Sequence, residues 1–180
     1  MRGRSPLLLL CFWLAAAWSC PSLADDQAAT TSLRDAVVFK LLMFVDWPQN
    51  PQADAPEAFR FCVLDDGGRS PMMAELDGKR LRNRTLTLLR ITRDAASLRQ
   101  CHAIFIDAGN QRHLAGVAAG TRPAPVLIIA EGNLAIQEGA IIALSTAGGR
   151  IVFDVNLAAA RAANLAISSK LLRVARSVFE

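Results

Sequence analysis

Two continuous apolar runs near the middle of the chain restrict the fold more than any other feature. They are "HAIFID" (residues 102–107) and "PVLIIA" (residues 125–130), and a helical segment, "NQRHLAGVAA", lies between them. A strand that is apolar on both faces belongs in the centre of a sheet that is covered on both sides. Helices that alternate with such strands predict a single-domain α/β sandwich with a mixed central β-sheet flanked by helices.

The flanking segments supply further strands and helices. Strands are expected at "FRFCVL", on either side of Asn83-Arg84, and in a hairpin that turns at Gly148-Gly149. Helix caps or ends are expected at Ser32, Pro48, Asp94, Asn156 and either Ser168 or Ser169. The pattern leaves the order of the strands open.

The first helix, expected between Ser32 and Pro48, is apolar on nearly every side. Its wet edge is expected to consist of Arg34, Asp35, Lys40 and Asp46. A helix of this kind is buried on most of its surface, within its own domain or partly against another protein. The polar stretch before it, "DDQAATT", is expected to be frayed.

Residues 1–24 have the pattern of a secretory signal peptide. They begin with two arginines and no acid, run apolar from Leu7 to Trp18, and close on small residues up to Ala24. The apolar run of about 12 residues is shorter than the roughly 20 that a membrane-spanning helix needs, which favours a cleaved leader over a spanning anchor. We therefore expect cleavage after Ala24, export, and one domain over residues 25–180.

The charge of the exported chain indicates no particular partner. Lys and Arg number 20 and Asp and Glu number 16, but Arg2 and Arg4 leave with the signal, so 18 basic and 16 acidic residues remain, a net charge of +2. This balance does not provide the basic surface that nucleic-acid binding requires. We expect no nucleic-acid partner.

Two of the four cysteines, Cys62 and Cys101, lie beyond the signal peptide. In an oxidising compartment, two and only two cysteines favour one disulfide. Cys62 lies within the strand "RFCVL" and Cys101 at the start of "CHAIFI", so a bridge is geometrically possible if these strands are neighbours in one sheet. Two free, buried thiols are the alternative.

No catalytic or metal-binding set is found in the sequence. A cysteine nucleophile needs a histidine within hydrogen-bond reach, but Cys101 and His102 are adjacent on a strand and are expected to point to opposite faces. Two histidines and two paired cysteines are too few for the usual four-ligand zinc site. Because no Ser-His-Asp order, Walker loop or dinucleotide fingerprint occurs either, we expect a protein that is not an enzyme and uses no cofactor or metal.

Acidic residues follow three of the expected strands: Asp65 and Asp66 the first, Asp107 the second and Glu131 the third. In open α/β sheets, ligands bind at the carboxyl ends of the strands. A small-ligand-binding protein that uses this edge is therefore an alternative function. The other interpretation is that these acids are ordinary solvated loop residues.

Two segments are candidates for contact with another protein. Trp47, at the end of the first helix, either closes the core over that helix or stacks on a ligand. A C-terminal helix over "SSKLLRVARSVF" would place Leu171, Leu172, Val174, Ala175 and Val178 on one face and Lys170, Arg173 and Arg176 on the other. This helix either packs on the sheet or binds a partner.

The ordered motifs of the chain resemble those of the YfiR/HmsC family of small exported bacterial proteins. The motifs are "VVFKLLMFVDWP", "FRFCVLDD", "LDGKRLRNRTLTLLRI", "CHAIFI", "PVLIIAEG" and "GGRIVFDVNLAAARAANLAISSKLLRVAR". The resemblance extends from about residue 33 to residue 176. The Trp-Pro helix end and the long C-terminal motif are its most specific parts.

This resemblance implies a periplasmic regulatory protein. Members of the family repress a membrane-bound diguanylate cyclase by binding its periplasmic sensor region, which lowers cyclic di-GMP and biofilm formation. An outer-membrane lipoprotein as a second partner is also implied, and Cys62 and Cys101 match the family's long-range disulfide in position. Residues 102–180 lack the second cysteine pair of some members.

On this basis we expect a partner-binding surface that includes Phe44, Trp47, Leu172, Arg173 and Arg176. Its apolar helices are also compatible with a homodimer.

Overall fold

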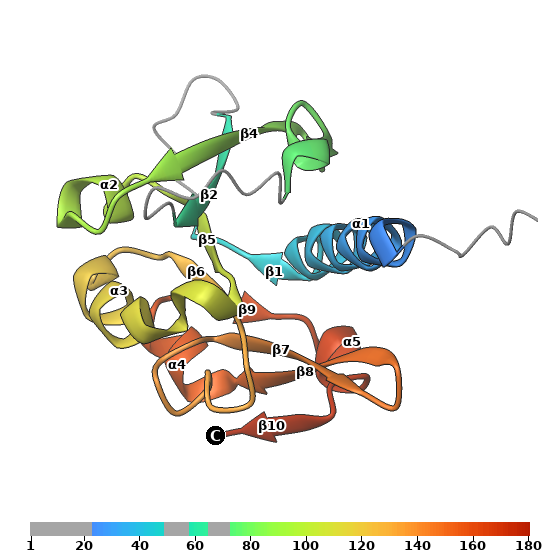
Figure 1. The fold of residues 1–180 in the computed structure, drawn as a ribbon. Helices are drawn as coiled ribbons and strands as arrows, with labels where there is room; N and C mark the ends of the chain where they lie inside the picture. The colour runs from blue at the N-terminus through green and yellow to red at the C-terminus, as the bar shows by residue number, and fades with distance from the viewer. Residues whose placement is uncertain (1–22, 49–57, 65–72) are drawn as a thin grey trace, which may run out of the picture.

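The structure, a computed structural model, describes residues 23–48, 58–64 and 73–180. The predicted signal peptide lies outside the described residues except for Leu23 and Ala24, and so do Asp65 and Asp66. Within this part of the chain the elements form an eight-stranded mixed sheet with helices on both faces (Figure 1). The α/β sandwich predicted from the sequence is confirmed.

Helices and strands follow one another along the described chain. In order, they are α1 (Leu23–Leu42), β1 (Val45–Asp46), β2 (Phe59–Leu64), η1 (Ala74–Leu76), β3 (Arg80–Leu81), β4 (Arg84–Ile91), α2 (Ala95–Arg99), β5 (Ala103–Ile106), η2 (Ala108–His113), α3 (Leu114–Thr121), β6 (Leu127–Glu131), β7 (Ile142–Ala147), β8 (Arg150–Asn156), α4 (Leu157–Ala162), β9 (Ala166–Ile167), α5 (Ser169–Leu172) and β10 (Ser177–Phe179).

The main sheet has the strand order β10-β8-β7-β6-β5-β2-β4-β3. The β7–β8 and β3–β4 pairs are antiparallel, and the other neighbours run parallel. The two apolar runs of the sequence form the central strands β5 and β6. The predicted hairpin turn at Gly148-Gly149 is confirmed, and both glycines have positive φ, the conformation that residues without a Cβ adopt at least cost.

The two faces of the central strands bury two different sets of side chains. On β2, Phe61 and Val63 belong to the core under α1, whereas Cys62 and Leu64 belong to the core under α2 and α3. Figure 1 shows α1 on one side of the sheet and α2 and α3 on the other. This arrangement explains why β2, β5 and β6 are apolar at successive positions.

The first helix differs from the sequence prediction at both ends. It begins at Leu23, upstream of Ser32, and it stops at Leu42, where the chain turns and enters β1. The stretch "DDQAATT" is therefore helical. The short strand β1 pairs antiparallel with β9, matching Val45 with Ile167, and this contact with a segment remote in the sequence ends the helix before Pro48.

Asp35 was expected on the wet edge of the first helix, but it is only 4% exposed. Its Oδ2 accepts a hydrogen bond of 2.9 Å from the backbone N–H of Met73. Burial raises the pKa of the Asp35 carboxyl, and the hydrogen bond from Met73 opposes this rise. Asp35 also holds Met73 in a left-handed conformation, with φ 65°, that a non-glycine residue rarely adopts.

The raised pKa of Asp35 makes stability depend on pH in a definite direction. The folded state holds this proton more tightly than the unfolded chain, so the contribution of Asp35 is fully present below its ordinary value of 3.8 and is lost as pH rises through the folded pKa. Asp35→Asn keeps an acceptor for Met73 and removes the titration. We expect the free energy of unfolding of this variant, relative to the wild type, to increase as pH rises through this window.

Urea denaturation at several pH values measures this difference, with the exposed Glu180→Gln as control. A difference between Asp35→Asn and the wild type that stays constant with pH would contradict the assignment.

The C-terminal segment is not the long helix that the sequence predicts. The cap at Ser168 is confirmed, but α5 ends at Leu172 and residues 177–179 form β10, which pairs parallel with β8. The backbone N–H of Arg176 donates to the carbonyl of Phe153 at 2.8 Å, which draws the chain into the sheet. The predicted faces of this helix are therefore wrong beyond Leu172.

Candidate functional site

The short ribbon of β1 and β9 brings Phe44 next to the start of α5. The backbone N–H of Ser168 donates to the carbonyl of Phe44 at 2.9 Å, and the Ser168 hydroxyl caps α5 by accepting from the N–H of Lys170. Leu172 and Arg173 lie at the other end of this one-turn helix. Phe44, Leu172 and Arg173, which the sequence suggested for partner contact, are thus placed on connected elements.

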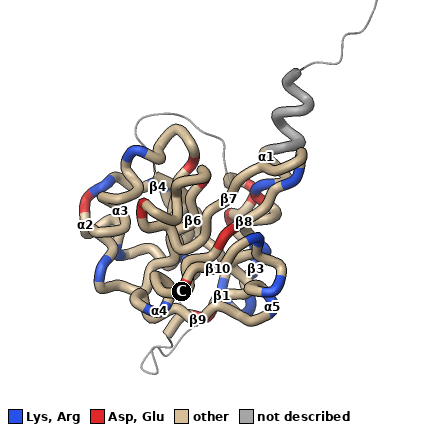
Figure 2. Tube along the Cα trace, turned by 90° about the horizontal axis from the view of Figure 1, so that it is seen from below, with Lys and Arg blue, Asp and Glu red and all other residues tan. Residues whose placement is uncertain are grey.

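The turns around this ribbon carry exposed apolar side chains. Val174 is 69% exposed and Met43 is 47% exposed. Neither is among the five residues suggested from the sequence, which placed Val174 on the apolar face of a continuous helix that either packs on the sheet or binds a partner. Figure 2 shows Lys and Arg positions around β3 and α5 on the side that also carries β1, so basic residues border this area.

Arg176 has a structural partner. Its Nε and Nη2 donate to the two carboxylate oxygens of Asp154, which is only 6% exposed. These hydrogen bonds raise the pKa of Arg176. This arginine anchors the start of β10 to β8, whereas Arg173 is an exposed cation of the same segment.

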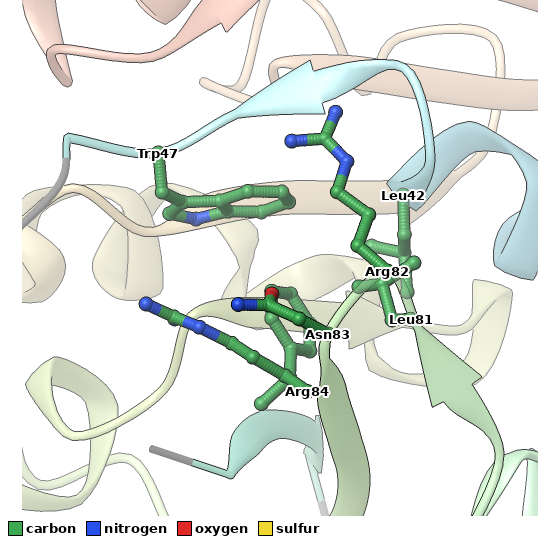
Figure 3. A pocket seen from close by; sticks show the side chains of 7 residues that line it. Leu42, Trp47, Leu81, Arg82, Asn83 and Arg84 are labelled. Carbon is green, nitrogen blue, oxygen red and sulfur yellow. The ribbon is translucent and has the colours of Figure 1, made fainter. Parts of the chain in front are cut away.

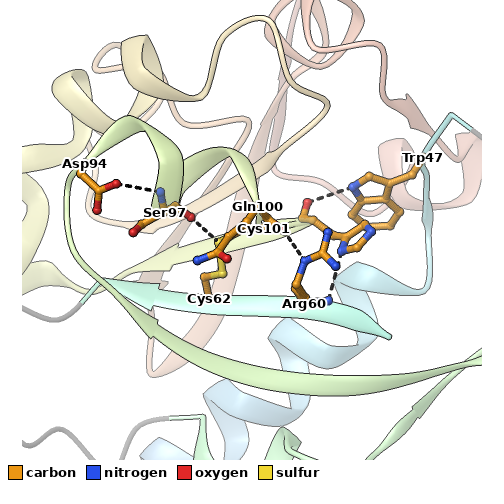
Figure 4. Close-up of a disulfide and its surroundings, with 8 residues drawn as sticks. Trp47, Arg60, Cys62, Asp94, Ser97, Gln100 and Cys101 are labelled. Carbon is orange, nitrogen blue, oxygen red and sulfur yellow. Dashed lines mark hydrogen bonds between the residues drawn. A yellow bond between two sulfur atoms is a disulfide. The ribbon is translucent and has the colours of Figure 1, made fainter. Parts of the chain in front are cut away.

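Trp47 packs against the core, as one of the two interpretations of the sequence held. Its Nε1 donates to the carbonyl of His102 at 2.9 Å (Figure 4). Its ring meets Phe59 edge-on, with centroids 4.9 Å apart. A Trp ring whose N–H is satisfied inside the structure is held in one orientation. One side of the ring nevertheless lines a cavity.

His102 and Cys101 point to opposite faces of the sheet, as predicted. The His102 ring stacks on Phe59 at 5.0 Å, whereas Cys101 lies in the core under α2 and α3. His102 Nδ1 accepts from the backbone N–H of Arg60 at 3.1 Å, and this places the ring proton on Nε2. The arrangement does not provide a cysteine nucleophile with a histidine base.

A disulfide joins Cys62, which lies within β2, to Cys101, which lies two residues before the start of the neighbouring strand β5. Their Cα atoms are 6.0 Å apart, within the normal range for a disulfide. Asp94 caps the adjoining α2 by accepting from the N–H of Ser97 at 2.9 Å (Figure 4). Hydrogen bonds from Ser97 and Thr92 hold the pKa of Asp94 well below its usual range.

A cavity of about 140 Å³ lies between Trp47 and the β3–β4 hairpin (Figure 3). The hairpin turns at Arg82 and Asn83, and Arg82 has a positive φ of 57° although it is not glycine. Its guanidinium donates to the carbonyls of Met43 and Val45 and pairs with Asp46 at 2.6 Å. These contacts fasten the hairpin to β1 and hold the turn in its strained conformation.

The two acids of the carboxyl edge that the structure describes, Asp107 and Glu131, have partners within the protein. Asp107 caps η2 by accepting from the N–H of Asn110 at 2.9 Å. Glu131 pairs with Arg34 at 2.7 Å and accepts from the N–H of Ala108 at 3.1 Å. A hollow of about 340 Å³ lies beside this pair.

Two polar atoms at that hollow are buried without a hydrogen-bond partner among the described residues. They are Arg34 Nε and Ser145 Oγ, and both residues line the hollow together with Glu131.

Among the described residues, no group of three His, Cys, Asp or Glu side chains could hold a metal ion. The same part of the chain contains no helix that is long and apolar enough to cross a membrane.

The chain is similar to a family of known proteins. A sequence profile of the YfiR/HmsC-like family matches residues 31–176, which is most of the chain.

The chain belongs to the YfiR/HmsC-like family.

Membership of the YfiR/HmsC-like family suggests a periplasmic regulator of cyclic di-GMP signalling that interacts with a regulatory partner in that compartment. The family is one of regulatory repressors rather than of known enzymes. No curated protein matches the chain.

A solved structure that is similar to this YfiR/HmsC-like chain comes from Vibrio cholerae and is described as a conserved domain protein. The TM-score is 0.56 at 12% sequence identity, over 82% of this chain and 60% of that one. This chain therefore spans less than two thirds of the length of that protein, and the likeness concerns the fold alone.

Proposed function

We propose that this protein acts by binding in the periplasm, where it represses a membrane-bound diguanylate cyclase through contact with the cyclase's periplasmic sensor region. Family membership supports the signalling pathway. The observation that carries the binding role is the exposure of Met43 and Val174, which are chain neighbours of Phe44 and Arg173 in the turns that follow α1 and α5. The protein performs no catalysis in this proposal.

The five residues suggested from the sequence take different roles in this proposal. Phe44, Leu172 and Arg173 contact the partner, because α5 and the adjoining turn present them near exposed apolar side chains. Trp47 and Arg176 position that surface, since Trp47 is bonded to His102 and Arg176 to Asp154. A half-exposed apolar patch of this kind, bordered by basic residues, is typical of a protein contact.

Repression follows from differential affinity. If the protein binds the inactive arrangement of the cyclase more tightly than the active one, binding shifts the population toward the inactive state. An outer-membrane lipoprotein that competes for the repressor would release the cyclase, and a homodimer could present two copies of the surface.

Deletion of the gene in its host tests the proposal. We expect intracellular cyclic di-GMP to rise and to return to the parental level when the wild-type gene is restored. Restoration with Val174→Glu should leave cyclic di-GMP high, because a charge in the apolar contact opposes binding, whereas the control Leu134→Glu, at another exposed apolar position, should complement fully.

Periplasmic levels of each variant are compared by immunoblot, so that loss of the protein is separated from loss of contact. Equal complementation by both variants would contradict the proposed surface. An unchanged cyclic di-GMP level after deletion, in cells that express the protein, would contradict the repressor function itself.

The second candidate function is binding of a small ligand at the carboxyl edge of the sheet. The hollow of about 340 Å³ and the buried, unpartnered Arg34 Nε and Ser145 Oγ beside it favour this function within the described part of the chain. The ion pair of Arg34 and Glu131 makes the hollow nearly neutral overall, which favours an uncharged polar ligand. The deletion experiment separates the two functions, since this one predicts no necessary change in cyclic di-GMP.

A further inference from the structure

The cavity beside Trp47 has an apolar floor and a cationic wall. Leu42, Phe59 and Leu81 contribute the apolar part, and Arg84 and Asn83 contribute the polar part. Figure 3 shows the side chains of Arg84 and Asn83 extending into the space beside the Trp47 ring, whereas Arg82 extends toward β1. Arg82 and Arg84 therefore extend in different directions from the same hairpin.

Arg82 has acceptors within the protein, whereas no acceptor for Arg84 is found among the described residues. Arg82 pairs with Asp46 and donates to two backbone carbonyls. The contact that the structure shows for Arg84 is an approach of its Nη1 to Nε2 of His102, at 3.3 Å. Because His102 Nδ1 accepts from the backbone, Nε2 carries the ring proton, and both nitrogens of this contact are donors.

Two donors cannot satisfy each other, so the charge of Arg84 requires an acceptor from elsewhere. Among the described residues, no carboxylate pairs with Arg84, although it is half-buried. A guanidinium removed from water without an acceptor is costly. An anionic oxygen in the cavity would meet the planar fork of Arg84 in the geometry that arginine prefers.

The rest of the cavity indicates what carries that oxygen. A volume of about 140 Å³ is too small for a nucleotide or a sugar phosphate, and its wall includes the fixed ring of Trp47 and aliphatic side chains. An apolar surface of this kind suits the methylene groups of a short aliphatic acid better than a bare phosphate, which has no apolar part.

We propose that this cavity binds the carboxylate of a short aliphatic acid, either a free molecule or a glutamate side chain of another protein, with Arg84 as the ion-pairing residue and Asn83 as a hydrogen-bond partner. The site does not depend on the repressor function proposed above.

The fluorescence of Trp47 provides a measurement of ligand binding in this cavity. Of the three tryptophans, Trp13 and Trp18 lie in the predicted signal peptide, so the processed protein has Trp47 as its one fluorophore of this kind. The processed protein is titrated with glutarate, with the peptide acetyl-Ala-Glu-Ala-amide, with inorganic phosphate, and with the uncharged glutaramide. We expect a saturable change in Trp47 emission with glutarate or with the peptide, and none with phosphate or glutaramide.

Arg84→Gln should weaken the binding of the active probe by about tenfold or more, in keeping with the loss of a charge-assisted, bidentate contact. Arg80→Gln is the matched control, since it removes one charge from the same hairpin at an exposed position that does not line the cavity. Circular dichroism and thermal melting of both variants show whether the fold is retained, and Asn83→Ala provides a second variant.

The two carboxylate probes distinguish the sources: saturation by glutarate alone indicates a free acid, and saturation by the peptide indicates a protein side chain. No saturable change with either probe, equal binding of phosphate, or unchanged affinity in folded Arg84→Gln would overturn the proposal.

Discussion

Replacing Cys62 and Cys101 together with alanine is expected to lower the free energy of unfolding by about 4 kcal/mol. The bridge closes a loop with a sequence separation of 39 residues, and the chain-entropy relation gives about this value for a loop of that length. Both cysteines are buried in the core under α2 and α3, so a small loss of packing adds to the entropic effect. The effect is large relative to the total stability of about 5–15 kcal/mol that is usual for a domain.

Urea denaturation of the double variant and of the oxidised and reduced wild type measures this contribution. The reduced wild type is the matched control, since it retains both sulfur atoms and loses only the bond. We expect it to be destabilised almost as much as the double variant. A midpoint that is the same for the oxidised wild type, the reduced wild type and the double variant would remove the disulfide from this account.

Phe59→Ala is expected to destabilise the fold by about 3–5 kcal/mol, the range for truncation of a buried aromatic side chain. Phe59 is fully buried and touches both Trp47 and His102 with its ring. Its loss opens a space under both rings, and the neighbouring backbone of β2 prevents complete collapse into it. Because Trp47 loses its edge contact and gains access to water, its emission should also shift to longer wavelength.

Phe179→Ala is the control for this experiment, because Phe179 is an exposed aromatic residue on β10. Its truncation should change stability by no more than about 0.5 kcal/mol, as is usual for surface positions. Equal effects of the two substitutions, or an unchanged emission in Phe59→Ala, would show that the Trp47 cluster does not form as described.

The features that the sequence predicted correctly depend on local patterns. The apolar runs of β5 and β6, the cap at Asp94 and the turn at Gly148-Gly149 are each determined by residues close together in the chain. The disulfide could also be predicted, because the expected removal of a signal peptide leaves two cysteines and the expected export places them in an oxidising environment. These patterns were enough for the fold class.

The errors concern segments whose structure is decided by distant partners. Val45 looks helical beside Leu41 and Leu42, but it pairs with Ile167 in another part of the chain. Residues 173–179 have helical spacing, yet β10 pairs with β8, and the side chain of Arg176 donates to Asp154 of β8. Asp35 was assigned to solvent because its partner is the backbone N–H of Met73, which no side-chain pattern reveals.

The candidate site was predictable only in part for the same reason. Trp47 stands out in the sequence, but Arg84 resembles the other arginines of its segment. Arg84 differs from the other arginines because its Nη1 approaches Nε2 of His102, so that two hydrogen-bond donors face each other. Sequence motifs cannot reveal such a contact, because the tautomer of His102 is determined by the backbone N–H of Arg60 on strand β2.

The packing of α1 against residues near the end of the chain has a consequence for the order in which the core can form. The inner face of α1 packs in a core that also contains Ala160, Leu165 and Leu171, all near the end of the chain. A polypeptide that crosses a membrane with its N-terminus first delivers α1 early and these residues last. In the predicted export of this chain, the apolar side of α1 would therefore lack these packing partners until the last residues have crossed, and exposed apolar surface of this kind promotes aggregation.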